Sequence, residues 1–132
     1  PTEEPKPGAP LALARAYMGE EPRAVGAWTE ALVSLATKGG VALWGAGAKG
    51  VTLANMIDPT GERIACLIDI NPRKHNRFVP LSAHRILDPV AASAAGVRSA
   101  MVMNPNYTPE ITAMLGDAGI DMTLTDETMI QP

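Results

Sequence analysis

The sequence has only one cysteine, Cys66, and two histidines. A single thiol excludes an intrachain disulfide, and these few residues cannot supply the four thiolate or imidazole ligands of a structural zinc site. Cys66 lies within an apolar run at residues 64–68, where a cysteine acts as a small buried hydrophobe. We therefore expect a fold without covalent or metal cross-links, and no chemistry at Cys66.

Long apolar runs and an excess of positive charge are missing as well. No stretch approaches the roughly 20 apolar residues of a membrane helix, and no basic and apolar leader opens the sequence. The formal net charge is −3, whereas nucleic-acid-binding proteins usually carry a clustered excess of Lys and Arg. These absences predict a cytoplasmic protein that binds neither a membrane nor nucleic acid.

The size and composition fit one globular domain. The 132 residues are 46% apolar and 19% charged, which is ordinary for a soluble domain. The chain opens at Pro1, and its first ten residues contain four prolines, a composition typical of a linker. We expect a linker at residues 1–10 and a single domain at residues 11–132, as a fragment of a larger protein.

Helical and strand-like patterns alternate along the chain. A short helix is expected at residues 11–18, and a longer one from about residue 20 to the glycine pair at 39–40. The longer helix has an apolar stripe formed by Val25, Trp28, Leu32 and Leu35. Strands are expected at 41–44, 64–68, 99–103 and 122–124, with helices at 49–57, 89–95 and 109–118, the last capped by Thr108.

This alternation predicts an α/β fold, a Rossmann-like doubly wound parallel sheet of four to five strands with helices on both faces. The 41–44 strand should lie between 64–68 and 99–103, with 121–125 beyond the latter and a short extra strand near 85–87 outside 64–68. Ligands of such sheets bind beyond the carboxyl ends of the strands, where the strand order reverses. We expect the loops after 41–44 and 99–103 to face one crevice.

Residues 45–50 form a GxGxxG motif between a predicted strand and a predicted helix. The glycines allow a tight turn and close approach of a ligand, and the N–H groups at a helix start attract phosphate. Lys49 would place a cation beside that phosphate. In the alternative interpretation, the glycines only let helix and strand pack closely, and Lys49 is a solvated surface residue.

Polar residues also follow the second predicted strand. Asp69 ends this strand, where an acid in dinucleotide-binding folds accepts hydrogen bonds from a ribose hydroxyl, so an NAD-type site is an alternative. Asp69 could instead cap a turn. Arg73, Lys74 and Arg77 form a positive cluster that either clamps a diphosphate or covers a loop in water.

The third strand is followed by Asn104, Asn106 and Tyr107, which either bind polar groups of a sugar or base or build a strand-to-helix turn. Spacing places no carboxylate or nucleophile beside His75 or His84, so we expect surface or loop histidines. Near the end of the chain, Asp126 and Glu127 are expected to be solvated.

Taken together, three segments resemble the C-terminal domain of the S-adenosylmethionine-dependent C-methyltransferases that act on nucleotide-linked deoxysugars. These segments are LWGAGAKGV at 43–51, DINPRK at 69–74, and NPNY at 104–107 with Glu110-Ile111. The resemblance implies a Rossmann-like domain that binds the nucleotide-linked sugar and holds it against a central methyltransferase domain. It implies no catalytic residue, metal or cofactor within this domain.

The same resemblance implies that a full-length enzyme carries a zinc-binding amino-terminal domain and a central domain holding S-adenosylmethionine and the catalytic acid and base. That enzyme would remove a proton beside a sugar ketone, and the enolate carbon would attack the activated methyl. The ligand-binding residues expected in this domain are Gly45, Ala46, Gly47, Lys49, Gly50, Asp69, Asn71, Lys74, Asn104, Asn106 and Tyr107. An NAD-type domain and a purely structural buttress remain alternatives.

The sequence departs from the family pattern in three places. Asn76 and Leu81 stand where the family usually has glycines, so we expect the loop at residues 77–84 to take another shape. Ala48 replaces a commoner serine, which removes a hydroxyl from the glycine loop.

Overall fold

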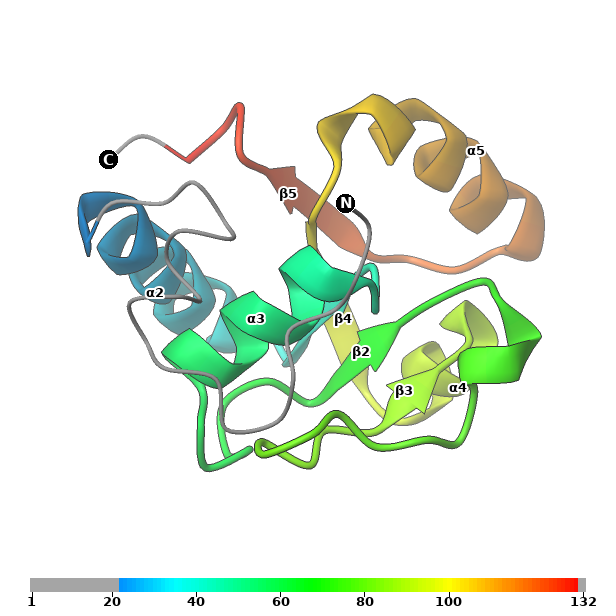
Figure 1. Ribbon diagram of the computed structural model, residues 1–132. Helices are drawn as coiled ribbons and strands as arrows, with labels where there is room; N and C mark the ends of the chain where they lie inside the picture. Colours follow the sequence, from blue (N-terminus) through cyan, green and yellow to red (C-terminus); the bar gives the residue numbers. More distant parts are fainter. Residues whose placement is uncertain (1–21, 131–132) are drawn as a thin grey trace.

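The apolar runs of the sequence form strands, and the periodic stretches between them form helices. The computed structural model describes residues 22–130; the helix expected at residues 11–18 lies outside them. The elements in chain order are α2 (Pro22–Ala36), β1 (Gly40–Trp44), α3 (Ala48–Ile57), β2 (Cys66–Ile68), the 3-10 turn η1 (Pro72–Lys74), β3 (Ile86–Leu87), α4 (Pro89–Ala94), β4 (Val97–Val102), the 3-10 turn η2 (Pro105–Tyr107), α5 (Thr108–Ala118) and β5 (Thr123–Asp126) (Figure 1).

The strands form one parallel sheet in the order β3-β2-β1-β4-β5. At its centre, Leu43 of β1 lies opposite Leu67 of β2 and Met101 of β4. The predicted α/β class and strand order are confirmed, including the short outer strand β3. The order reverses between β1 and β4, because the chain first builds outward from β1 through β2 to β3 and then returns to the other side of β1.

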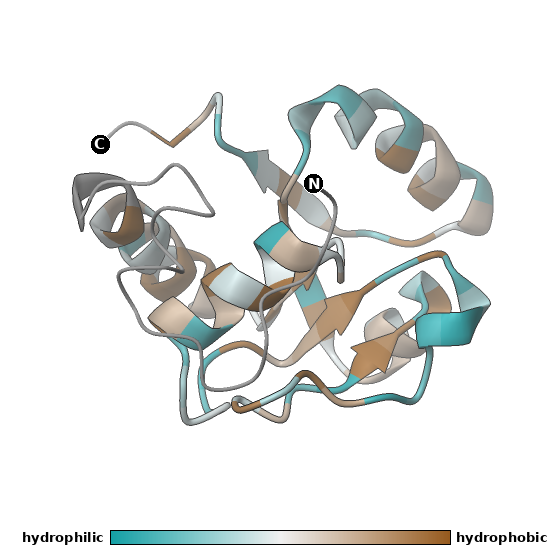
Figure 2. Cartoon of the chain, viewed as in Figure 1, coloured by the Kyte–Doolittle hydropathy of each residue, from teal (hydrophilic) through white to brown (hydrophobic). Residues whose placement is uncertain are grey.

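Both faces of the sheet are covered by helices. Successive side chains of a strand point to opposite faces, so Val41 and Leu43 pack in one apolar cluster with α2 and α3, whereas Ala42 and Trp44 pack in another with α4 and α5. Figure 1 shows the two pairs of helices on either side of the sheet, and in Figure 2 strands β2 and β3 are brown, the colour of apolar residues. A strand buried on both faces has no polar side, which explains the short unbroken apolar runs of the sequence.

The predicted apolar stripe of the first described helix is confirmed. Trp28, Leu32 and Leu35 of α2 are buried, and Val25 is partly buried beside them. Cys66 is buried in the opposite cluster, and burial raises the pKa of its thiol to about 11. A thiol of that pKa stays protonated at neutral pH, in line with a packing role.

Several local expectations were wrong. The second strand begins at Cys66 and not at residue 64, because the Ile64 N–H donates to the Asp58 carboxylate at 2.7 Å. Thr108 does not cap α5 but is its first residue, and its hydroxyl donates to Asp126 at 2.8 Å. Asp126 is not solvated: it ends β5 and is buried.

None of the helices within residues 22–130 is long and apolar enough to cross a membrane.

The loop before β3 contains three residues other than glycine with left-handed backbone, namely Asn76 at φ 64°, Leu81 at φ 70° and Ala83 at φ 61°. Asn76 and Leu81 are the two positions at which the resemblance implied glycine. The loop therefore has a backbone conformation at both positions that glycine would adopt with less strain.

Replacing Leu81 by Gly is expected to raise the free energy of unfolding by about 0.5–1 kcal/mol. A left-handed conformation costs a side-chain-bearing residue roughly 1–2 kcal/mol, which exceeds the roughly 0.5–1 kcal/mol that glycine loses through backbone entropy. Leu81 is 65% exposed, so little apolar burial is lost. Urea denaturation measures the change. Leu81→Ala keeps the strained backbone and serves as the control; equal stabilisation by both variants would show that φ is not the cause.

Candidate ligand-binding cleft

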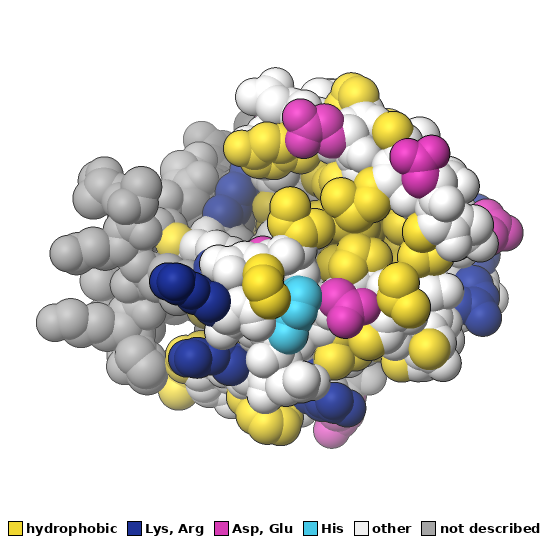
Figure 3. All heavy atoms as spheres, turned by 90° about the vertical axis from the view of Figure 1, so that its right-hand side faces the viewer, with side chains coloured by type: hydrophobic (Ala, Val, Ile, Leu, Met, Phe, Trp, Pro, Cys, Tyr) yellow, Lys and Arg dark blue, Asp and Glu magenta, His cyan; other side chains and the backbone are white. Residues whose placement is uncertain are grey.

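A cleft of about 800 Å³ opens at the carboxyl ends of β1, β2 and β4. It lies where the strand order reverses, between the glycine loop on one side and η2 and α5 on the other. Its lining residues are Trp44, Gly45, Gly47, Ala48, Lys49, Gly50, Asp69, Ile70, Val102, Met103, Asn104, Tyr107, Glu110, Ile111 and Met114. Figure 3 shows hydrophobic side chains gathered in a hollow on this side of the molecule, with acidic side chains beside them. The predicted shared crevice of the first and third loops is confirmed.

The glycine loop uses its three glycines in three different ways. Gly45 has φ 124°, a conformation that L side chains rarely adopt. At Gly50 a Cβ would collide with the Gly45 carbonyl oxygen, so α3 can lie this close to the loop only with glycine there. At Gly47 a Cβ would meet nothing within 4 Å. Close packing therefore explains Gly50, whereas Gly47 leaves open space in the cleft wall.

The start of α3 faces the same cleft. Gly47 is the N-cap and provides no side-chain hydrogen bond to the first turn. The first N–H groups of a helix have no partner within it, and the helix dipole makes this end partly positive. An anion entering the cleft beside Gly47 would meet this helix end.

Asp69 ties the first two loops together. Its Oδ2 accepts a hydrogen bond from the Ala46 N–H at 3.1 Å, and its Oδ1 accepts one from the Asn71 N–H at 2.8 Å. The Asp69 carbonyl oxygen accepts a third from Nε2 of His75. Asp69 thus caps a turn and also lines the cleft. Each carboxylate oxygen keeps a further lone pair for a ligand hydroxyl.

Lys74 and Asn71 support these loops from outside the cleft lining. Nζ of Lys74 donates to the Ala46 carbonyl oxygen at 3.2 Å, and Oδ1 of Asn71 accepts from the Arg73 N–H at 3.1 Å at the start of η1. Both side chains fix the shape of the glycine loop and its neighbour. Ala46 itself is buried.

Lys49 lines the cleft, and its amino group is paired. Nζ of Lys49 lies 3.3 Å from Oε2 of Glu127, and both side chains are partly exposed. Glu127 is exposed, as expected, but the sequence did not indicate its pairing with Lys49. Lys49 and Glu127 are 78 positions apart in the sequence, so local spacing gave no sign of the pair.

The third loop is built around Asn104. Its Oδ1 accepts from the Asn106 N–H at 3.0 Å, and its carbonyl oxygen accepts from the Tyr107 N–H at 3.0 Å. This is the turn that the sequence offered as one interpretation. Asn104 and Tyr107 also line the cleft, and Tyr107 is 54% exposed. Asn106 contributes its backbone to the turn and is not among the lining residues.

The structure thus brings most of the predicted site residues to one cleft, namely Gly45, Gly47, Lys49, Gly50, Asp69, Asn104 and Tyr107. Sequence reasoning missed its apolar wall, which is formed by Trp44, Ile70, Val102, Met103, Ile111 and Met114. It also missed Glu110, in the first turn of α5. Little in the sequence indicated the apolar wall, because the apolar strand ends and the apolar face of α5 have the same composition as residues of a protein core.

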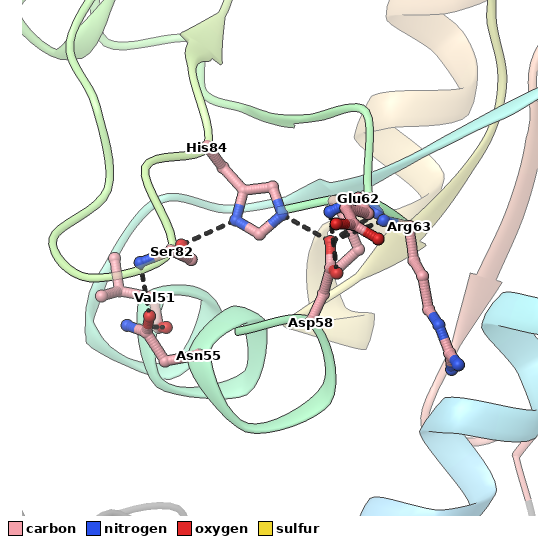
Figure 4. A network of polar contacts seen from close by, with 8 residues as sticks. Val51, Asn55, Asp58, Glu62, Arg63, Ser82 and His84 are labelled. Carbon is pink, nitrogen blue, oxygen red and sulfur yellow. Dashed lines mark hydrogen bonds and ion pairs between the residues drawn. The ribbon is translucent and has the colours of Figure 1, made fainter. Parts of the chain in front are cut away.

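A second polar cluster, formed around Asp58, Ser82 and His84, lies outside the cleft (Figure 4). Asp58 follows the last turn of α3, which runs back from the carboxyl end of β1, so it lies near the strand amino ends. Its Oδ2 lies 2.7 Å from Nε2 of His84, whose Nδ1 lies 2.7 Å from the Ser82 hydroxyl. His84 lies in the loop before β3, as expected, but it is only 4% exposed and has a carboxylate partner that spacing did not indicate.

Asp58, His84 and Ser82 are the residue types of a nucleophilic triad, but here they form a clamp. All three are buried, and none lines the cleft. Asp58 also accepts the N–H groups of Glu62, Arg63 and Ile64 at 2.7–3.1 Å. Burial raises the pKa of Asp58, but the hydrogen bonds from the Ile64 N–H, the His84 ring and the Arg63 N–H outweigh it and hold the pKa below its ordinary value. The clamp joins α3, the approach to β2 and the strained loop.

A parallel sheet with helices on both faces and a cleft at the reversal of strand order defines an α/β domain of the Rossmann-like class. The sequence matches the family described as C-methyltransferase C-terminal domain over residues 23–120, and the chain belongs to this family. This match confirms the resemblance drawn from the three sequence segments. No curated protein matches the sequence.

Proposed function

We propose that this chain is the nucleotide-sugar-binding domain of an S-adenosylmethionine-dependent C-methyltransferase that acts on deoxysugars, and that it is not catalytic alone. The observation that carries the proposal is the cleft, in which the glycine loop and the Asn104 loop meet at the carboxyl edge of the sheet. The family match supplies the reaction class.

The cleft has separate regions suited to the two chemical halves of a nucleotide sugar. The start of α3 and the amino group of Lys49 suit a diphosphate, because both favour negative charge and Gly47 leaves space for it. The cleft is also lined by Met103, Ile111 and Met114, which form an apolar wall suited to a base or to a sugar with few hydroxyls. Asp69 and Asn104 line the same cleft and offer polar groups that can bind the remaining hydroxyls.

We further propose a division of labour within a larger cytoplasmic enzyme. S-adenosylmethionine and the catalytic acid and base would belong to a central methyltransferase domain, zinc to an amino-terminal domain, and this domain would hold the nucleotide sugar against the central one. Binding by the separated domain is then weakened, because part of the sugar pocket belongs to the partner domain. The ligand still loses its translational and rotational freedom on binding, but fewer contacts offset this cost.

An NAD-type site is the second candidate. The observation that favours it is the position of Asp69, which directly follows β2 and lines the cleft, where dinucleotide-binding folds use an acid to bind ribose. The two candidates differ in the ligand that the cleft prefers. A third interpretation, a domain that only buttresses its neighbour, requires that the cleft bind neither.

Replacing Lys49 by Ala is expected to weaken binding of a thymidine-diphosphate sugar by about 1–3 kcal/mol, the usual contribution of a charge-assisted hydrogen bond. Wild type and variant are titrated with that sugar nucleotide, with NAD and with S-adenosylmethionine, while the amide resonances of Gly45, Gly47 and Gly50 are followed. Lys38→Ala, at an exposed position after α2 and outside the cleft, is the matched control.

The expected result is saturable binding of the sugar nucleotide alone, weakened by Lys49→Ala and unchanged by Lys38→Ala. Tight binding of NAD would favour the second candidate. Micromolar binding of S-adenosylmethionine would contradict the proposed division of labour. If none of the three ligands binds, the third interpretation is favoured, in which the domain only supports its neighbour.

A further inference from the structure

The charge of the cleft is unusual for a diphosphate site. Among its lining residues within the described part of the chain, Lys49 is the single lysine or arginine, whereas Asp69 and Glu110 supply two carboxylates. Glu127 adds a third acidic group 3.3 Å from the Lys49 amino group. Lys49, the single lysine or arginine lining the cleft in the described part of the chain, therefore already has an anionic partner within the protein.

Glu127 is held at this position by its neighbours. Asp126 pairs in register with Val102 of β4, so the chain enters the turn from a fixed strand. The Asp126 carboxylate accepts from the Thr108 hydroxyl at 2.8 Å, from the Thr128 N–H at 2.9 Å and from the Thr128 hydroxyl. The Met129 N–H closes the turn on the Asp126 carbonyl oxygen at 3.0 Å.

The electrostatics of Asp126 agree with this rigidity. Its hydrogen bond from the Thr128 hydroxyl lowers the pKa of Asp126, burial opposes this, and the bond from Thr108 lowers it further. Asp126 is therefore ionised at neutral pH and keeps these bonds. Because Thr108 begins α5, the same carboxylate joins the Glu127 turn to the helix that forms the far wall of the cleft.

We propose that Glu127 limits how much negative charge a ligand of the cleft can carry, because its carboxylate competes with the ligand's phosphate for Lys49. This inference rests on the proposed function and concerns the regulation of the same site. A ligand that binds at Lys49 must share or displace the Glu127 carboxylate. Ligands with more negative charge meet more repulsion from it, so Glu127 favours a diphosphate diester, such as a nucleotide sugar, over a free nucleoside diphosphate.

The size of the expected effect on affinity follows from the exposure of the Lys49–Glu127 ion pair. Partly exposed ion pairs are screened by water and salt and contribute little each. We expect Glu127→Gln to tighten binding of thymidine diphosphate about two- to fivefold at low ionic strength. The gain should be smaller for a thymidine-diphosphate sugar, absent for thymidine, and reduced in high salt.

The experiment measures the dissociation constants of thymidine diphosphate, a thymidine-diphosphate sugar and thymidine for wild type, Glu127→Gln, Lys49→Met and the double variant. Asp117→Asn is the matched control, because Asp117 is an exposed acid on α5 that does not line the cleft. Support requires that Glu127→Gln tighten diphosphate binding, that Asp117→Asn leave it unchanged, and that the gain vanish in the Lys49→Met background.

The other outcomes overturn the proposal in distinguishable ways. Unchanged or weaker diphosphate binding by Glu127→Gln, with clear binding by wild type, overturns the role of Glu127 and leaves the proposed function standing. A gain that persists without Lys49 shows a general repulsion and overturns competition for the lysine. Absence of binding of either diphosphate ligand by any variant overturns the proposed function, and this inference with it.

Discussion

Replacing His84 by Leu is expected to lower the free energy of unfolding by about 3–5 kcal/mol, the cost of removing one partner from a buried ion pair or strong hydrogen bond. Asp58 would stay buried and would lose the ring that contacts its Oδ2 at 2.7 Å. The Ser82 hydroxyl would lose its partner as well. Domains of this size are stable by only about 5–15 kcal/mol, so the loss is a large share of the total.

The measurement is urea denaturation of wild type and variant, with His75→Leu as the matched control. His75 is the other histidine and is only partly buried, so its removal should cost less than about 1 kcal/mol. Should His84→Leu fail to fold, His84→Gln keeps a hydrogen-bond donor near Asp58 and should fold with a smaller loss. A loss under about 1 kcal/mol for His84→Leu would show that the backbone N–H groups alone satisfy Asp58.

Acid unfolding gives a second readout of the same clamp. The folded pKa of Asp58 is lowered from its ordinary value. A carboxylate with a lowered folded pKa stabilises the fold above its unfolded pKa of about 3.9, and this contribution is lost as the pH falls through the folded pKa. The stability of wild type should therefore fall below about pH 4, and Asp58→Asn should remove Asp58's part of that slope.

The fold was predictable because its signals are local. The stripe of α2 repeats with the period of a helix, and β1 and β4 are short runs of buried residues. Helix α2 and strand β1 form where the sequence predicted them, whereas β4, predicted at 99–103, covers Val97–Val102. Strand order then followed from the alternation of strands and helices, since parallel crossovers have one hand and connections stay short. The GxGxxG motif placed one side of the cleft because a strand and a helix flank it.

The clamp and the Lys49–Glu127 pair were not predictable, because each joins segments far apart in the sequence. Asp58 and His84 are separated by 26 positions, and Lys49 and Glu127 by 78. Both contacts depend on how loops without any period close onto the sheet. The apolar wall of the cleft was missed for another reason. Apolar residues such as Met103 and Ile111 suit a core and a cleft equally well, and only the position of α5 decides which of the two they line.

Replacing Gly50 by Ala is expected to destabilise the domain by about 3 kcal/mol or more. The new Cβ would collide with the carbonyl oxygen of Gly45, and backbone cannot move aside as the end of a side chain can. Denaturation with urea measures the loss. Gly116→Ala is the matched control, because Gly116 lies within α5 with nothing near its Cβ position, and alanine there should stabilise the helix by up to about 1 kcal/mol. Equal tolerance of both substitutions would show that α3 can move away from the loop.

Gly47→Ala separates packing from binding in the same loop. A Cβ at Gly47 meets nothing within 4 Å, and the residue has φ −78°, which any residue adopts. The free energy of unfolding should therefore change by less than about 1 kcal/mol, the loss expected at an N-cap. The methyl group nevertheless enters the cleft beside the start of α3, where the proposed diphosphate would approach the backbone. Affinity for a thymidine-diphosphate sugar should fall about tenfold, or 1.4 kcal/mol. A stable Gly47→Ala variant with wild-type affinity would place the diphosphate away from this loop and leave Gly50, with its packing role, as the glycine that the fold requires.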